Sequence, residues 1–185
     1  MIRARMLTVF LSFLFLLPTV GFAKTQKDEA PPPYQDTPVE RFGEIEAGLY
    51  RSAQPEDGLQ LAALKEMGIK TILSFQTDKK KIAAEAAIAK SLGLKFISRP
   101  LDGFWRPKPE EANEVQGYMN DHSLRPLLIH CSHGRERTGL MGGLYRYYTN
   151  KWTPQEAYKE MKAYGFRSIV FSMKDYLEDA TDTDL

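Results

Sequence analysis

The chain has 185 residues, one cysteine, three histidines and a formal net charge of +1 at pH 7. This length suits a single domain with a sizeable hydrophobic core. The near-balanced charge offers no basic excess for binding a nucleic acid. One cysteine cannot form an intramolecular disulfide, and so few cysteine and histidine ligands argue against a zinc site.

The first 23 residues have the three parts of a secretory signal peptide. Arg3 and Arg5 form the positive part, residues 6–17 form an almost continuous apolar part, and Ala23 is the small residue at the end. We expect cleavage after Ala23 and secretion, into a periplasm. An uncleaved membrane anchor is the alternative, but the apolar part is shorter than the roughly 20 residues of a spanning helix.

Residues 24–41 contain four prolines, mixed charges and little to bury, which predicts a flexible linker. From Phe42 onward strand and helix patterns alternate without an internal repeat, so we expect one domain over residues 42–185. This order predicts an α/β fold, with a central, mostly parallel sheet flanked by helices. The predicted strands cover residues 47–52, 70–75, 95–100 and 126–130, and the predicted helices cover 59–67, 80–92, 109–121 and 139–148.

Two more helices are predicted after residue 150. Thr153 as N-cap, Pro154 at the first helical position and Glu156 form a capping box, and Gly165 ends that helix. Apolar residues recur at helical spacing in the last segment, which predicts a final helix packed over the sheet. These residues are Ile169, Val170, Met173, Tyr176 and Leu177.

Asp102 lies just beyond the predicted strand at residues 95–100. An aspartate before a glycine is common in turns for purely local reasons. However, open α/β sheets bind ligands beyond the carboxyl ends of their strands, which makes Asp102 a candidate functional residue. Residues 103–107 would then form a mobile wall of the substrate pocket, in which Trp105 either stacks on an aryl group or caps the core, with Arg106 beside it.

The segment from His130 to Gly139 joins the strand at 126–130 to the helix that follows. The first backbone N–H groups of a helix are unpaired and carry the positive end of its dipole, so they attract phosphate. A cysteine in that position ionises readily, which makes Cys131 a candidate nucleophile. The planar fork of Arg137 fits two phosphoryl oxygens, and Gly134 permits a left-handed backbone.

A lone cysteine at a strand end is most often a small core residue. The combination of cysteine, glycine, arginine and threonine at these spacings favours a phosphate-handling loop instead. Its predicted phosphate-binding residues are Ser132, His133, Gly134, Arg135, Glu136 and Arg137.

Cys131, Arg137 and Thr138 match a known signature: His-Cys, five residues, arginine, then serine or threonine. The chain thereby resembles the cysteine-dependent protein tyrosine phosphatase superfamily. Residues 49–55, 68–76, 100–103 and 152–166 look like the small dual-specificity-type phosphatases, nearest to the secreted bacterial and the atypical plant and fungal enzymes. The similarity extends from Phe42 to the C-terminus, and it implies that Asp102 is the general acid.

The expected reaction needs no metal or other cofactor. The Cys131 thiolate attacks the phosphorus of a monoester while backbone amides and Arg137 hold its oxygens. Asp102 protonates the leaving oxygen and then activates water to hydrolyse the phosphocysteine, while Thr138 hydrogen-bonds the sulfur.

Phosphotyrosine in a protein is the first expected substrate. Inositol polyphosphates and pyrophosphates are the alternative, because related atypical enzymes act on them. Those polyanions favour several cations around the loop, and enzymes with that activity tend to have two basic residues before the catalytic arginine. This chain has Arg135 and then Glu136. The other cations available are His133, Arg99, Arg106 and Lys108. A rhodanese-type sulfurtransferase and a non-catalytic phosphate-binding module are remote alternatives.

Overall fold

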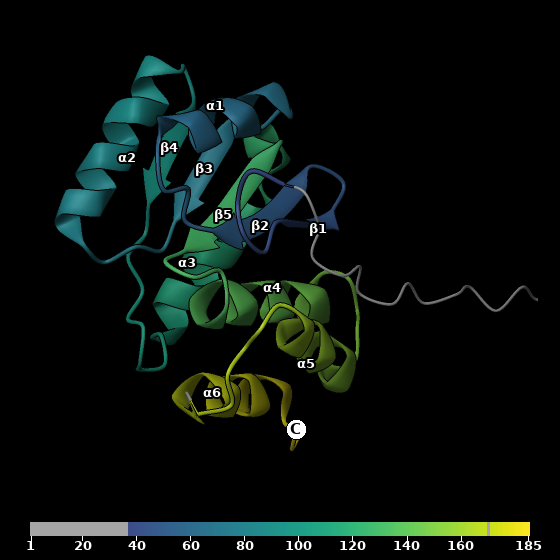
Figure 1. Ribbon diagram of the computed structural model, residues 1–185. Helices are drawn as coiled ribbons and strands as arrows, with labels where there is room; N and C mark the ends of the chain where they lie inside the picture. The colour runs from purple at the N-terminus through teal and green to yellow at the C-terminus, as the bar shows by residue number, and fades with distance from the viewer. Residues whose placement is uncertain (1–36, 170) are drawn as a thin grey trace, which may run out of the picture.

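The computed structural model describes residues 37–169 and 171–185. It confirms the expected α/β class, with a five-stranded sheet in the order β1-β2-β5-β3-β4 (Figure 1). The pairings β2–β5, β5–β3 and β3–β4 are parallel, and β1 at the edge is antiparallel to β2. The strands are β1 (Gly43–Glu46), β2 (Leu49–Ala53), β3 (Thr71–Ser74), β4 (Lys95–Ser98) and β5 (Leu127–Cys131).

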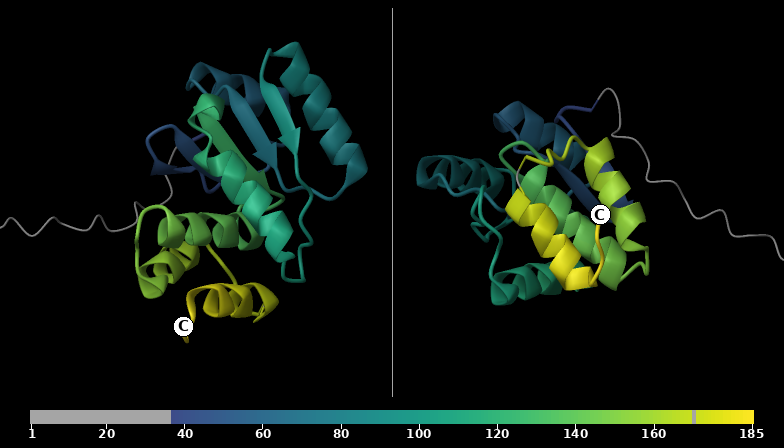
Figure 2. Two further views of the ribbon diagram at one scale, coloured as in Figure 1. Left: turned by 180° about the vertical axis from the view of Figure 1, so that it is seen from behind. Right: turned by 90° about the horizontal axis from the view of Figure 1, so that it is seen from below.

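Helices cover both faces of the sheet. Helices α1 (Gly58–Glu66) and α2 (Lys79–Ser91) cover one face, and α3 (Pro109–Asn120) and α4 (Glu136–Tyr148) cover the other. Helices α5 (Pro154–Ala163) and α6 (Phe171–Thr181) pack against α4 on the side away from the sheet (Figure 2). A short 3-10 turn, η1 (His122–Leu124), precedes β5.

The central strands are buried on both faces, as parallel strands between helical layers are. Successive side chains of a strand point to opposite faces. Ile72 and Leu128 therefore join the core under α1 and α2, whereas Leu73 and Ile129 join the core under α3 and α4. Cys131 belongs to the second core, so the alternation along β5 directs its side chain toward α4.

The N-terminal edge of the sheet differs from the prediction. One strand over residues 47–52 was expected, but Ala47 and Gly48 form a two-residue turn between β1 and β2. Gly48 has a φ of +78°, a conformation that glycine adopts without strain and that a tight hairpin turn requires. The first strand was missed because its four residues, GEIE, contain only one large apolar side chain.

The other helices and strands lie within one or two residues of the predicted ranges, with two exceptions. Helix α4 begins at Glu136 rather than at 139, because its first three residues are polar and buried and therefore break the apolar pattern. Helix α6 packs on α4 and α5 rather than over the sheet. Its inward residues Met173 and Leu177 are buried, but Ile169 precedes the helix and is 74% exposed. The capping box at Thr153 is present as predicted.

The predicted signal peptide lies outside the described residues, as does most of the predicted linker. Residues 37–41, which the sequence assigns to that linker, pack onto the domain. Val39 is buried in the core under α1 and α2, and the Glu40 carbonyl accepts a hydrogen bond from Ala53 N at 2.8 Å. In the part of the chain that the structure describes, no helix is long and apolar enough to cross a membrane.

Glu46 at the end of β1 joins three other parts of the fold. Its carboxylate accepts hydrogen bonds from Tyr145 at 2.6 Å, Asn150 at 2.8 Å and Arg125 at 2.5 Å. Burial alone raises the pKa of this carboxyl, but the hydrogen bonds from Tyr145, Asn150 and Arg125 outweigh it and lower the pKa below 4.5. Burial and the bond to Glu46 raise the pKa of Tyr145 to about 12.

A lowered pKa in the folded state means that Glu46 stabilises the fold above about pH 4.5, and that this contribution is lost as the pH falls through the folded pKa. We predict that Glu46→Gln lowers the free energy of unfolding at pH 7 by about 1–3 kcal/mol, since hydrogen bonds to a charged group are worth about that much. Urea denaturation at pH 7 and pH 3.5 measures it, and the loss should shrink at the lower pH.

Glu44 in the same strand serves as the control, because its side chain forms no hydrogen bond or ion pair with residues 37–169 or 171–185. Glu44→Gln should change the free energy of unfolding by less than about 0.5 kcal/mol. An equal loss for Glu46→Gln at both pH values would contradict the ionic role of Glu46.

Candidate active site

The phosphate loop, defined as residues 131–137, lies between the end of β5 and the start of α4. Cys131 is the last residue of β5, is 1% exposed and carries a free thiol. Its strand is paired on both sides, with Ala53 of β2 opposite Cys131 and Ser74 of β3 opposite His130. The carboxyl ends of three parallel strands therefore meet at the cysteine, as expected for a binding site in an open α/β sheet.

The phosphate loop rests directly on the backbone of β2. Gly134 has a φ of +65°, and a Cβ atom there would lie 2.5 Å from the carbonyl oxygen of Ser52. No side chain fits that space, so glycine is required both for the backbone conformation and for the close approach. The backbone N–H of Gln54 also donates to the Ser132 carbonyl at 3.4 Å.

Arg51 lies beneath the phosphate loop, and sequence reasoning did not identify it as a site residue. It is 1% exposed, its Nη2 donates to the Gly134 carbonyl at 3.1 Å, and its guanidinium lies 3.9 Å from the centre of the Tyr164 ring. Burial lowers the pKa of Arg51 below 12.5, against the opposing charge of Glu160. Among residues 37–169 and 171–185, no carboxylate forms an ion pair with Arg51. Glu160 pairs instead with Arg146. The sequence did offer one signal for Arg51, which is an arginine within a strand whose other side chains are mostly buried.

Arg137 is held in one orientation by three acceptors. Its Nη1 donates to the carbonyls of Phe75 at 2.8 Å and Leu101 at 3.2 Å, and its Nη2 donates to Ser132 Oγ at 3.2 Å. Phe75 follows β3, and Leu101 precedes Asp102. A planar guanidinium fixed in this way is preorganised to bind an anion, and it ties three segments of the sheet edge together.

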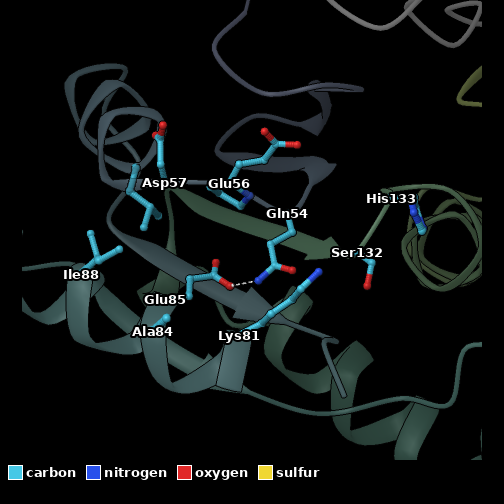
Figure 3. A pocket seen from close by; sticks show the side chains of 11 residues that line it. Gln54, Glu56, Asp57, Lys81, Ala84, Glu85, Ile88, Ser132 and His133 are labelled. Carbon is cyan, nitrogen blue, oxygen red and sulfur yellow. Dashed lines mark hydrogen bonds between the residues drawn. The ribbon is translucent and has the colours of Figure 1, made fainter. Parts of the chain in front are cut away.

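A chain of polar side chains extends from the phosphate loop to α2. Gln76 Nε2 donates to Ser132 Oγ at 2.9 Å and to Gln54 Oε1 at 2.7 Å. Gln54 in turn donates to Glu85 Oε2 at 2.8 Å (Figure 3), and Glu85 Oε1 lies 2.8 Å from His130 Nε2. Gln54 directly follows β2 and Gln76 lies two residues after β3. The rule that pointed to Asp102, a polar residue beyond a strand end, would have identified both glutamines.

Thr138 lies in the first turn of α4 and is fully buried. Its Oγ1 has no hydrogen-bond partner among the described residues, so the predicted bond to the Cys131 sulfur is not formed in this structure. A buried hydroxyl without a partner is costly. This hydroxyl is therefore available for a hydrogen bond that forms during a reaction.

Asp102 lies at the same edge of the sheet as Arg137, beside Leu101. Its Oδ1 accepts hydrogen bonds from the backbone N–H groups of Trp105 at 2.9 Å and Phe104 at 2.7 Å. These two bonds, together with the positive charge of Arg137, lower the pKa of the Asp102 carboxyl below 3.8. The carboxyl is exposed and ionised in the ligand-free protein. A general base needs this ionised form, whereas a general acid must first gain a proton.

The segment 103–107 is attached to α6. The Ser172 hydroxyl donates to the Phe104 carbonyl, and Arg106 forms an ion pair with Asp179 of α6. The ion pair places Arg106 beside α6, and its role in the substrate pocket stays a prediction. Trp105 is 72% exposed and does not cap the core, and its other role, stacking on an aryl group, stays a prediction.

Few of the cations near the phosphate loop are free to meet a polyanion. Burial, and then the charge of Arg135, lower the pKa of His133 below 6.5, so His133 is neutral at pH 7. Arg135 Nε lies 4.0 Å from Glu136, which also pairs with Arg167 at 2.6 Å.

Of the more distant cations, Arg99 pairs with Glu114 of α3 at 2.5 Å. Lys108 is the N-cap residue of α3, but its side chain makes no capping hydrogen bond. Among the described residues, no three histidine, cysteine or acidic side chains are placed to hold a metal ion.

Comparisons with known proteins agree with this geometry. The model of the family described as "DSP-PTPase phosphatase fused to NAD+ Kinase" matches residues 35–179. The dual specificity protein phosphatase TpbA of Pseudomonas aeruginosa PAO1 is 31% identical over 118 residues, which are 64% of this chain and 51% of that protein. The chain thus spans about half the length of the TpbA sequences it matches.

Two further similarities cover more of the relative. The crystal structure of P. aeruginosa TpbA superposes with a TM-score of 0.69 at 26% identity, covering 81% of this chain and 90% of that one. Inositol diphosphatase DSP4 of Arabidopsis thaliana is 24% identical over 145 residues, which are 76% of this chain and 72% of that protein. With its cysteine, arginine and aspartate gathered at one sheet edge, the chain belongs to the DSP-PTPase family, the dual-specificity-type protein tyrosine phosphatases.

Proposed function

We propose that this protein hydrolyses phosphomonoesters through a phosphocysteine intermediate, and that its main substrate is phosphotyrosine in proteins. The observation that carries the proposal is the arrangement around Cys131. The thiol lies at the floor of a loop at a helix N-terminus, and Arg137 is fixed beside it by three acceptors. The name of the similar TpbA, a dual specificity protein phosphatase, supports the same activity.

In the proposed reaction the Cys131 thiolate attacks phosphorus in line with the leaving oxygen. Arg137 and the backbone N–H groups of the loop bind the remaining phosphoryl oxygens, so developing charge meets preorganised donors. Arg51 adds a buried positive charge below the same loop. These groups supply the positive charge that the transferring phosphoryl group needs, and no step calls for a metal.

Asp102 protonates the leaving oxygen in this proposal. It is ionised in the free protein, but a phosphate dianion bound close by disfavours its charged form and raises its pKa. After the first step the carboxylate activates the water that hydrolyses the phosphocysteine. The unpartnered Thr138 hydroxyl then hydrogen-bonds the departing sulfur.

Two observations favour phosphotyrosine over the inositol phosphates suggested by the similarity to DSP4. Cys131 is 1% exposed, and a sulfur below the protein surface is reached more easily by a long phenolic ester. Around the loop, His133 is neutral at pH 7, and Glu136 pairs with both Arg135 and Arg167 and offsets one of their two charges, so fewer positive charges remain for a polyanion.

We predict that Cys131→Ser abolishes phosphate release from an aryl phosphate and from every natural substrate, because the hydroxyl is not ionised at neutral pH. For the unmodified protein, kcat/KM should be highest for a phosphotyrosine peptide, lower for a phosphoserine peptide and lowest for an inositol polyphosphate. Phosphate release measured on all three substrates tests this order.

Undiminished turnover by Cys131→Ser would contradict the proposed mechanism. A clear preference for the inositol polyphosphate would make the alternative substrate class correct. Transfer of sulfur from thiosulfate to cyanide would instead indicate a rhodanese-type enzyme, and binding of phosphopeptide without turnover would indicate a binding module.

We predict that Asp102→Asn lowers kcat for an alkyl phosphate by about 10²–10⁴-fold, the usual range for a general acid. The loss should be smaller for an aryl phosphate, whose leaving group needs less protonation. A general acid must be protonated, so kcat falls as the pH rises through the pKa of Asp102 in the substrate complex, and Asp102→Asn should remove that fall. Rates with both esters between pH 5 and 8 provide the measurement.

Asp121 is the matched control, because its exposed carboxylate also accepts a backbone N–H, from Ser123 at 2.9 Å, outside the phosphate loop. Asp121→Asn should leave both rates and the pH profile unchanged. Equal losses on the alkyl and aryl esters in Asp102→Asn would remove Asp102 from the acid role.

We also propose that the protein is exported to the periplasm and that residues 1–23 are removed. The support is the charged, apolar and small-residue order of that segment. In cell fractions, we expect a periplasmic protein whose N-terminal residue is Lys24, and deletion of residues 6–17 should keep it in the cytoplasm. Full-length protein in the membrane fraction would instead establish the segment as an anchor.

A further inference from the structure

A groove of about 510 Å³ opens beside the phosphate loop (Figure 3). It runs between α2 on one side and the segment from Gln54 to α1 on the other. Ser132 and His133 of the phosphate loop line one of its ends, so the groove is continuous with the proposed phosphate site. Its volume falls within the range of 300–1,000 Å³ that is typical of ligand sites.

The two ends of the groove differ in chemistry. Ser132, Gln54 and Lys81 line the end at the phosphate loop, whereas Ala84 and Ile88 line the far end (Figure 3). Leu61 of α1 also lines the groove and belongs to the core cluster against which Ile88 packs. Lys81 and Ile88 are seven residues apart on α2, which corresponds to about 10 Å along the helix axis. An extended peptide covers that distance in about three residues.

Charge distinguishes the groove from a polyphosphate site. Glu56, Asp57 and Glu85 line it against a single lysine, Lys81, and His133 at its end is neutral at pH 7. Glu85 is buried, its Oε2 accepts a hydrogen bond from Gln54, and its Oε1 lies 2.8 Å from His130 Nε2. The lining therefore carries a negative excess, which opposes further phosphate groups and acidic side chains and accepts apolar or basic ones.

We propose that this groove binds the extended peptide segment next to the phosphorylated residue of a protein substrate, with an apolar side chain about three residues away seated among Leu61, Ala84 and Ile88. The inference rests on the proposed phosphatase activity and names the part of the substrate that this chain selects. Burial of that side chain supplies the affinity, and the acidic lining rejects glutamate or aspartate at the same place.

The first experiment compares substrates on the unmodified protein. Phosphotyrosine peptides carry leucine, serine or glutamate at the third residue on one side of the phosphotyrosine, and a second set varies the other side. In one of the two sets we expect kcat/KM for the leucine peptide to exceed that for the serine peptide about tenfold, with the glutamate peptide lowest. Equal kcat/KM values within both sets would overturn the proposal.

The second experiment blocks the groove. Ala84 is exposed on α2 and lines the far end, whereas its neighbour Ala83 is exposed but does not line the groove. Arginine is a good helix former, so both Ala84→Arg and Ala83→Arg should fold. We expect Ala84→Arg to lower the ratio of kcat/KM for the leucine peptide to that for an aryl phosphate about tenfold, and Ala83→Arg to leave this ratio unchanged.

The aryl phosphate separates the two proposals. No hydrolysis of it by the unmodified protein would overturn the proposed function itself. Normal hydrolysis, together with an unchanged ratio in Ala84→Arg or an equal fall in Ala83→Arg, would overturn the groove assignment alone. Faster turnover of an inositol polyphosphate than of the leucine peptide would also contradict it.

Discussion

The active site depends on one close contact between two backbones, where the phosphate loop lies on the end of β2. Gly134 meets Ser52 at a distance that excludes any side chain, and Arg51 reaches from β2 to hold the Gly134 carbonyl. Because β2 is paired with β5, the same strand positions both the loop and the strand that carries Cys131. The position of the nucleophile is thus a property of the sheet rather than of the loop alone.

Arg137 extends this constraint to the rest of the site. It donates to carbonyls that follow β3 and precede Asp102, so the arginine proposed to bind phosphate also determines where the loop of the proposed acid begins. The remainder of that loop is held from the other side by Ser172 and Arg106–Asp179. Helix α6, which follows the phosphate loop by more than 30 residues, thereby helps to fix the position of the proposed acid Asp102.

Local patterns were sufficient for most of the fold. The apolar runs at β3 and β5 and the capping box at Thr153 predicted these elements correctly, because each pattern depends on a few adjacent residues. The elements that were missed depend instead on contacts between residues far apart in the sequence. The edge strand β1 and the first turn of α4 are made of polar residues whose burial or pairing comes from distant partners, so no periodicity marked them. The ion pair of Arg106 with Asp179 likewise joins residues that are far apart in the sequence, so no local pattern predicts it.

The sequence by itself determined the family and the proposed chemistry, because cysteine, arginine and threonine at fixed spacing in one loop require no other part of the chain to be recognised. The tertiary structure alone decided what surrounds that loop. Arg51, Gln76 and Glu85 come from three different elements, and folding brings them together at the carboxyl ends of parallel strands. The groove beside Ser132 arises in the same way, since its two walls are separated in sequence and its charge is the sum of residues from both.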